Sequence, residues 1–127
     1  MRNIVNTANA PTAIGIYSQA VKAGNTYYLA GQIALDPTTQ MLVDGDVKVQ
    51  AIQIFKNIQA VCEAAGGSLN HIIKLTVYVK HMADMASVND VMAAVFQAPF
   101  PARTAIGVNE LPKNALVEVE ALMFLDD

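Results

Sequence analysis

Charged residues are scarce in this chain of 127 residues. They make up 15% of it, against roughly 25% in an ordinary soluble domain, while hydrophobic residues reach 54%. A domain of this size has a large surface for its volume and normally covers that surface with polar side chains. Because too few polar side chains are present, we expect apolar surface to be buried against other copies of the chain. The composition therefore predicts an oligomer.

Basic residues are few as well. Eight Lys and Arg stand against eleven Asp and Glu, which gives a net charge of −3, and the basic residues are scattered along the chain. Such scattering leaves no electrostatic footprint for nucleic acid. No apolar run approaches the roughly 18–20 residues that a membrane span needs. We therefore expect neither nucleic acid nor a membrane as a partner.

Cysteine and histidine are rare. Cys62 is the single cysteine, and His71 and His81 are the two histidines. One cysteine cannot form an intrachain disulfide, which favours a reducing compartment, and these three residues show no metal-ligand spacing. The first residues hold a lone Arg and no apolar stretch of the kind found in secretory signals. We expect a cytoplasmic protein without a metal. Cys62 lies on the apolar side of a predicted helix, where we expect it to fill the hydrophobic core.

Hydrophobic alternation predicts most of the strands. A period of two indicates a strand whose alternate residues face opposite sides. The last strand differs because both of its faces carry apolar residues, as expected when one face packs on helices and the other on a partner. Strands are predicted near residues 4–5 and at 18–21, 26–33, 72–80 and 116–125. The inward face of 72–80 is predicted to carry Ile73, Leu75, Val77 and Val79.

Two segments have helical spacing. The first begins near Asp46, a candidate N-cap, and ends at Gly66 and Gly67, where glycine permits a left-handed turn. The second covers about 84–97 and is stopped by Pro99 and Pro101. Strands and helices in this order predict a single α+β domain over residues 1–127, with a mixed sheet and two helices on one of its faces.

Arginine occurs only at positions 2 and 103. Arg103 lies in the segment 100–107, which is otherwise uncharged and mostly apolar. A guanidinium in such surroundings needs a partner, because burying it unpaired is costly. One interpretation is an ion pair with Glu118 or Glu120. The other is a two-pronged receptor for the carboxylate or phosphate of a ligand, and the residues alone leave both open.

Glu118 and Glu120 stand two apart on one predicted strand. They therefore share a face, roughly 6.5–7 Å from each other. Carboxylates at this separation occur in glycosidases, but alternating Glu also solvates an ordinary strand face. The better functional interpretation is one carboxylate that positions a water molecule. Pairing with Arg103 or a lysine is the structural alternative, and the pattern alone favours it.

Gly31 and Tyr17 are two further candidates. Gly31 interrupts a strand pattern, which marks either a bulge or the close approach of another backbone or a ligand. Tyr17 follows Ile16 in a loop. A tyrosine there is more often half-buried packing than a hydroxyl donor to a ligand.

Nine blocks of sequence carry a resemblance. Five are the most characteristic: IGIYSQA at 14–20, LAGQI at 29–33, PART at 101–104, LPK at 111–113 and VEVEA at 117–121. Four more are NI at 57–58, EAAGGSL at 63–69, KLTVYV at 74–79 and VN at 88–89. Each block alone is a weak signal. Together, in this order and spacing, they resemble the RidA (YjgF/YER057c/UK114) family over essentially the whole chain.

The resemblance implies a chorismate-mutase-like fold, assembled as a homotrimer with a central β-barrel and a ligand cleft at each subunit interface. It also implies a reaction: hydrolysis of reactive 2-enamine and 2-imine acids, such as 2-aminoacrylate released by pyridoxal-phosphate enzymes, to 2-keto acids and ammonia. Neither a cofactor nor a metal is implied. The alternative is a non-catalytic trimeric binder of small 2-keto or amino acids. A ribonuclease is disfavoured by the acidic balance and the absence of a basic groove.

The same resemblance implies roles for six positions. Arg103 matches the residue that grips the substrate carboxylate, and Glu118 the residue that holds the attacking water. Cleft positions are implied for Tyr17, Gly31, Ala105 and Asn89, with Ala105 contributing its backbone. An iminium carbon is already electrophilic, so such a site mainly has to orient the acid and place a water beside it.

Three positions depart from the family pattern. Ile16 stands where many members have proline, Ala105 where many have cysteine, and Met92 where an aromatic residue is common. These changes leave Arg103 and Glu118 in place and bear on substrate range and rate.

Overall fold

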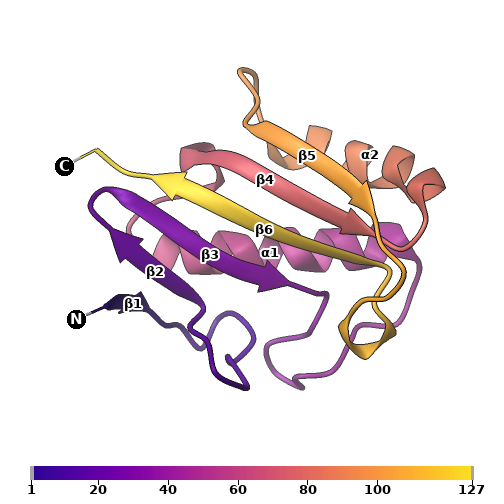
Figure 1. Cartoon of the computed structure of the whole chain (residues 1–127), viewed down its shortest axis with the longest axis horizontal. Coiled ribbons are helices and arrows are strands. Elements are labelled where there is room, and N and C mark those ends of the chain that lie inside the picture. Colours follow the sequence, from indigo (N-terminus) through magenta and orange to yellow (C-terminus); the bar gives the residue numbers. More distant parts are fainter. Residues whose placement is uncertain (1, 127) are drawn as a thin grey trace.

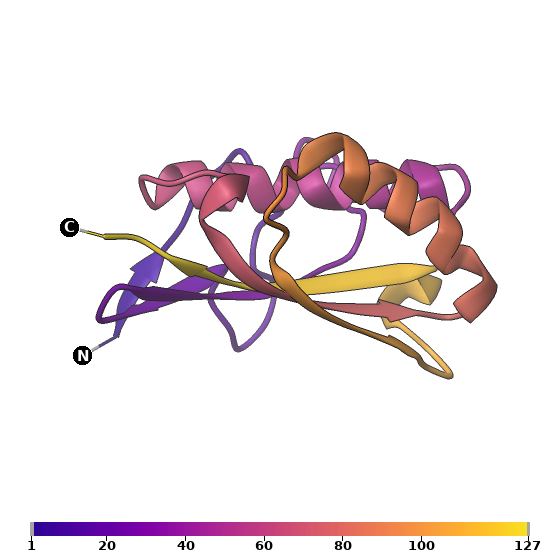
Figure 2. The same cartoon turned by 90° about the horizontal axis from the view of Figure 1, so that it is seen from above.

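Two helices cover one face of a six-stranded sheet in the computed structural model, which describes residues 2–126 (Figures 1 and 2). The predicted α+β architecture, with both helices on one face, is confirmed. The strands are β1 (Asn3–Val5), β2 (Ala20–Ala23), β3 (Thr26–Gln32), β4 (Ile72–Val79), β5 (Ala102–Gly107) and β6 (Val117–Phe124). The helices are α1 (Val47–Ala64) and α2 (Met85–Val95), with short 3₁₀ turns at Leu69–His71, Met82–Asp84 and Pro112–Asn114.

The sheet is mixed. Its strand order is β1-β2-β3-β6-β4-β5. Every neighbouring pair is antiparallel except β4 and β5, which are parallel and joined through α2. The last strand of the chain, β6, therefore lies in the middle of the sheet between β3 and β4 (Figure 1). In this central position the backbone of β6 is hydrogen-bonded to a strand on each side, which fixes the positions from which its side chains project.

The helix boundaries follow from local chemistry. The side chain of Asp46 accepts a hydrogen bond from the Val49 amide at 3.1 Å, as the predicted N-cap of α1 should. Gly66, with a φ of +94°, turns the chain after that helix. Helix α2 ends at Val95, earlier than predicted, because Phe96 adopts an extended backbone and packs edge-on against Phe55 of α1. None of the described helices is long and apolar enough to cross a membrane.

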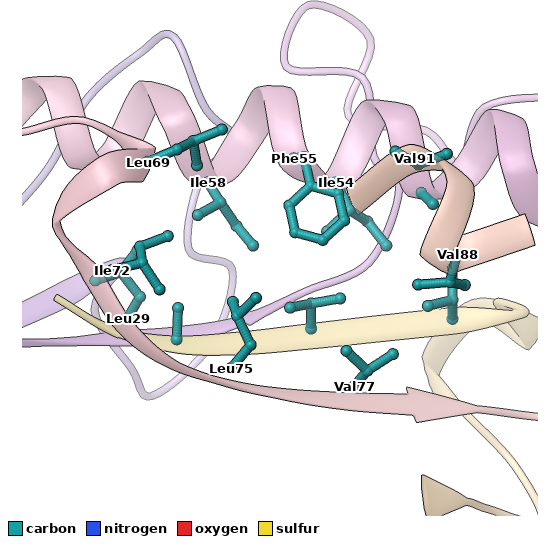
Figure 3. Packing of buried hydrophobic residues seen from close by; sticks show 14 of the residues in the cluster. Leu29, Ile54, Phe55, Ile58, Leu69, Ile72, Leu75, Val77, Val88 and Val91 are labelled. Carbon is teal, nitrogen blue, oxygen red and sulfur yellow. The ribbon is translucent and has the colours of Figure 1, made fainter. Parts of the chain in front are cut away.

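The core lies between the helices and the sheet (Figure 3). Ile54, Phe55 and Ile58 of α1 are at most 1% exposed and meet Leu75 and Val77 of β4, which are fully buried. Burying each such side chain contributes about 1.5–3 kcal/mol. Cys62 is also fully buried on α1, as predicted, and burial raises the pKa of its thiol to about 12.

The predicted inward face of β4 is wrong at one residue. Ile73 is 49% exposed, whereas the preceding Ile72 is 5% exposed and lies in the core. The cause is a shift of the β4–β6 register between Ile72 and Lys74. A bulge of this kind places two successive residues on one strand against one on its partner, so the period of two begins only at Leu75.

The other face of the sheet carries no helix (Figure 2). Large apolar side chains are exposed there, including Tyr28 at 51% and Phe124 at 39%. The alternate residues of β6 lie on this open face; Glu118, Glu120 and Leu122 are half-buried and Phe124 is exposed. The other face of β6 packs toward the helices as predicted, and the partner expected on the open face stays a prediction.

Candidate functional site

Glu118 is held against Gly31. β6 places Glu118 between the fully buried Val117 and Val119, so its side chain points to the open face of the sheet. A β-carbon at position 31 would overlap the Glu118 carboxylate oxygen Oε2 and would lie 3.2 Å from Cδ. The β3–β6 register also shifts between Leu29 and Gln32. Gly31 thus marks the bulge that was one of the two alternatives, while the group that approaches it is a side chain rather than the backbone or the ligand of the other alternative.

The Glu118 carboxylate lines a cleft of about 550 Å³. Tyr17 and Gly31 line the same cleft, so the structure brings these three predicted positions together. Tyr17 is 55% exposed, which makes the half-buried packing interpretation wrong. The remaining lining residues are Thr12, Ile14, Ala30, Ile33, Leu35, Pro112 and Lys113.

A buried glutamine fixes the loop that carries Tyr17. Gln19 is only 2% exposed. Its side chain accepts from the Thr7 amide at 2.7 Å and donates to the carbonyls of Thr7, at 3.0 Å, and Pro11, at 2.8 Å. Farther along, the Thr12 amide donates to Oε1 of Gln40 at 3.0 Å. These bonds replace those that a strand would supply, and they hold the loop at the edge of the cleft.

The two glutamates of β6 differ in their surroundings. Oε1 of Glu120 accepts a hydrogen bond from the Tyr78 hydroxyl at 2.5 Å, and this bond is the main reason that the pKa of Tyr78 is raised. The pKa of Glu118 is also raised, first by its burial and second by the negative charge of Glu120. Glu118 therefore combines access to a cleft with a pKa above the ordinary value of a glutamate, a combination typical of an acid–base group.

Arg103 lies elsewhere, on β5, a strand that the sequence analysis did not predict. It stands opposite the buried Leu75 in the parallel register, so its side chain faces the helices. Its Nη1 donates to Oδ1 of Asn89 at 2.5 Å and lies 3.4 Å from the sulfur of Met92, both on α2. The ion pair with Glu118 or Glu120, one of the two interpretations left open, does not form within one chain, because the partner of Arg103 there is Asn89.

A second cleft surrounds Arg103. Its volume is about 290 Å³, and it is lined by Asn89, Met92, Ala93, Phe100, Pro101 and Arg103. Ala105 is two residues farther along β5, half-buried and opposite Val77. Five of the six predicted site residues thus form two groups in one chain, and Ala105 lines neither cleft. Arg103 is in register with Leu75 and Glu118 with Tyr78, three residues apart on β4, and the two side chains face opposite sides of the sheet.

Sequence reasoning assigned no role to several residues of these clefts. Lys113 is the most notable, because it lines the Glu118 cleft and has a left-handed backbone with φ 54°. The block LPK drew attention to this position, but a positive φ at a lysine leaves no sequence signal. Among residues 2–126, no three His, Cys, Asp or Glu side chains are grouped so as to hold a metal ion.

Comparison with known proteins identifies the family. A family model described as Endoribonuclease L-PSP matches residues 7–124, and the chain belongs to this family, the RidA (YjgF) family. A RutC family protein of Pyrococcus horikoshii is 51% identical over 124 residues, which cover 98% of each chain. A protein of Dermatophagoides farinae named 2-iminobutanoate/2-iminopropanoate deaminase is 44% identical, again over 98% of each chain.

Solved structures agree with this assignment. RidA from the Antarctic bacterium Psychrobacter sp. PAMC 21119 is 48% identical, with a TM-score of 0.94 over 98% of this chain and all of that one. E. coli TdcF, solved with bound serine, is 37% identical, with a TM-score of 0.93 over 98% of this chain and 99% of that one. The fold is therefore that of RidA family structures, and one of them holds a small amino acid.

Proposed function

We propose that this protein is a 2-imino acid deaminase, which hydrolyses enamine and imine acids such as 2-aminoacrylate to 2-keto acids and ammonia. The observation that carries the proposal is the Glu118 carboxylate, which is half-buried against Gly31 at a cleft and has a raised pKa. A carboxylate placed in this way can take a proton from a water molecule beside it. The relatives named as deaminases support the same reaction.

We further propose that the working form is a homotrimer whose sheets form a central barrel. Two observations support association. The open face of the sheet exposes large apolar side chains, such as Tyr28 and Phe124, and an apolar patch of this kind usually marks an interface. In addition, Arg103 and Glu118 face different clefts of one chain. A neighbouring copy would bring its Arg103 beside Glu118 and complete the site between subunits.

In the proposed reaction Arg103 anchors the substrate. Its guanidinium holds the carboxylate of the imino acid in a two-pronged charge-assisted bond. Oδ1 of Asn89 accepts one hydrogen bond from Nη1 of Arg103 and so fixes the plane of the guanidinium. The other N–H donors of Arg103 remain available to the ligand. Tyr17 and Gly31 shape the cleft, and in the assembled trimer the backbone of Ala105 lines it.

Glu118 then moves the protons. An enamine acid such as 2-aminoacrylate first takes a proton from solvent on its methylene carbon and so becomes the iminium ion. The water oxygen then bonds to the electrophilic carbon of the iminium group as the carbon–nitrogen π bond opens onto nitrogen, and a proton of the water passes to the Glu118 carboxylate. The resulting carbinolamine takes that proton on its nitrogen, the carbon–nitrogen bond breaks, and ammonia leaves. The hydroxyl proton goes to solvent as the 2-keto acid forms. The route needs an oriented substrate, a base and an electrophilic carbon. Arg103 would orient the substrate and Glu118 would act as the base, while the iminium carbon of the substrate is already electrophilic.

A coupled assay tests this proposal. A serine dehydratase generates 2-aminoacrylate in situ, and semicarbazide traps the imine that remains. We expect faster imine decay with the wild-type protein and background decay with Arg103→Ala. Background decay with both would instead favour the non-catalytic binder, which the serine bound to E. coli TdcF makes the natural second candidate.

A further inference from the structure

Lys113 lines the same cleft as Glu118, and the proposed reaction leaves it without a role. It lies in the turn Pro112–Asn114, just before β6. Its side chain is exposed and, among residues 2–126, forms neither a hydrogen bond nor an ion pair. A ligand in the cleft would therefore meet a positive group and a negative group that are not bonded to each other.

The backbone of this turn is strained. Lys113 has φ 54° and ψ 25°, and the next residue, Asn114, has φ 61°. Residues with a β-carbon avoid this left-handed region because the β-carbon crowds the following carbonyl. Two such residues in succession persist only where the surroundings impose the conformation, and conformations of this kind concentrate at functional sites.

Two hydrogen bonds from other elements and one within the turn impose this conformation. Nζ of Lys80, just after β4, donates to Oδ1 of Asn114 at 3.2 Å. The Ala115 amide donates to the Pro112 carbonyl at 3.1 Å. The Leu116 amide donates to Oε1 of Gln50, a buried residue of α1, at 2.9 Å. The direction of Lys113 is therefore set by its neighbours rather than by contacts of its own side chain.

Among residues 2–126 of one chain, no cation is bonded to the Glu118 carboxylate, and in the proposed intersubunit site the Arg103 of a neighbouring copy is engaged by the carboxylate of the substrate. Glu120 on β6 adds a negative charge, Tyr78 on β4 is bonded to Glu120, and Lys80 is bonded to Asn114. From the loop side, Tyr17 lines the cleft. Lys113 is the one Lys or Arg among the residues that line this cleft.

We propose that Lys113 is a positioning residue that acts through Glu118, its ammonium supplying the positive charge that keeps the Glu118 carboxylate able to accept a proton from the attacking water. The inference rests on the proposed function. When a ligand fills the cleft and displaces water, screening between the two groups falls and their attraction strengthens. The left-handed turn places Lys113 at the cleft wall, from which its exposed side chain can reach a bound ligand.

The test compares Lys113→Met with Lys113→Arg, which keeps the charge, and with Lys56→Met, which removes an exposed lysine of α1. The measurement is kcat/KM against pH. We expect the acid limb of Lys113→Met to move up by about one pH unit, while Lys113→Arg and Lys56→Met keep the wild-type limb. A Lys113→Met profile that coincides with that of the wild type, or one lowered equally at every pH, overturns the inference but leaves the deaminase intact.

A second measurement does not depend on turnover. The carboxyl carbon of Glu118 is followed by ¹³C NMR with pyruvate bound, and its resonance is assigned by its absence in Glu118→Gln. We expect a higher titration midpoint in Lys113→Met than in the wild type. Equal midpoints overturn the role of Lys113. A wild-type protein that shows no imine hydrolysis overturns the proposed function, and the inference that rests on it falls with it.

Discussion

The Glu118 carboxylate occupies the space that a side chain at Gly31 would need. A β-carbon at position 31 would overlap Oε2 of Glu118, so the absence of a side chain on β3 fixes where the carboxylate of β6 can lie. This links a position that looks like an ordinary strand glycine to the group that we propose as the base.

Gly31→Ala should therefore act through Glu118. We expect it to destabilise the fold by about 1–3 kcal/mol, as overpacking does, and to remove most activity, because the carboxylate must leave its place. In a Glu118→Ala background the same change should cost little. Urea unfolding of the four proteins gives the coupling energy of the pair, and a cycle without coupling would show that the two residues do not share this space.

Glu118→Gln should lower kcat by two to four orders of magnitude, the usual contribution of a general base. Glu110→Gln, which changes an exposed glutamate of the loop before β6, is the matched control and should keep full activity. Because the pKa of Glu118 is raised, the wild-type rate should fall on acidification at a pH above that expected for an ordinary glutamate. Full activity in Glu118→Gln would remove the base from the mechanism.

The same raised pKa makes a prediction about stability. A carboxyl group whose pKa is higher in the folded state stabilises the fold fully below its unfolded pKa, and this contribution is lost as the pH rises through the folded pKa. At neutral pH the ionised Glu118 is therefore unfavourable, and Glu118→Gln should raise Tm. The gain should shrink as the pH falls through the raised pKa of the folded state, and it should be gone below about 4.3, the ordinary pKa of glutamate. Melting curves of the wild type and Glu118→Gln, measured from pH 4 to pH 8, test this. A lower Tm for Glu118→Gln at neutral pH would contradict a pKa of Glu118 that burial raises.

Asn89→Ala should weaken substrate binding more than it slows the chemistry. The change frees Nη1 of Arg103, so the guanidinium loses its fixed plane, and we expect KM to rise about tenfold with kcat changed little. Asp90→Ala, at the next position of α2 and exposed, serves as the control. An unchanged KM in Asn89→Ala would mean that Arg103 is oriented by something other than this bond.

Phe124→Asp should disrupt the assembly, because it places a charge on the open face of the sheet, where Phe124 is 39% exposed in the single chain. We expect light scattering after gel filtration to show a smaller species, and activity to be lost although every site residue is present. Met41→Asp, at an exposed position outside the six strands, should leave a trimer. An active monomer would contradict an intersubunit site.

Much of the fold could be predicted because its central elements carry strong periodic patterns. The cap at Asp46 and the turn at Gly66 bound α1 as expected. The edge strand β5 was not predicted, because polar and apolar residues do not alternate along its sequence. Most of its residues are exposed in the single chain. Ile73 was placed inward because the bulge that turns it outward depends on the register with β6, which no local pattern encodes.

The candidate site was predictable in its members but not in its layout. The motifs that resemble the family named Arg103 and Glu118, and the glycine at position 31 indicated a bulge as one of two alternatives, which the register shift of β3 bears out. Their separation into two clefts follows from the parallel pairing of β5 with β4, a tertiary feature. The left-handed turn at Lys113 is set by hydrogen bonds from distant residues, and it could not be deduced from the residue itself.

The most direct test of a site shared between subunits is complementation. Arg103→Ala and Glu118→Gln are each expected to be inactive alone. After unfolding and refolding together in equal amounts, about one quarter of the interfaces should pair an intact Arg103 with an intact Glu118, because each interface draws its two halves from different copies. We predict activity near that fraction of the wild type, against none when the variants are mixed without refolding. Co-refolded trimers without activity would contradict the account.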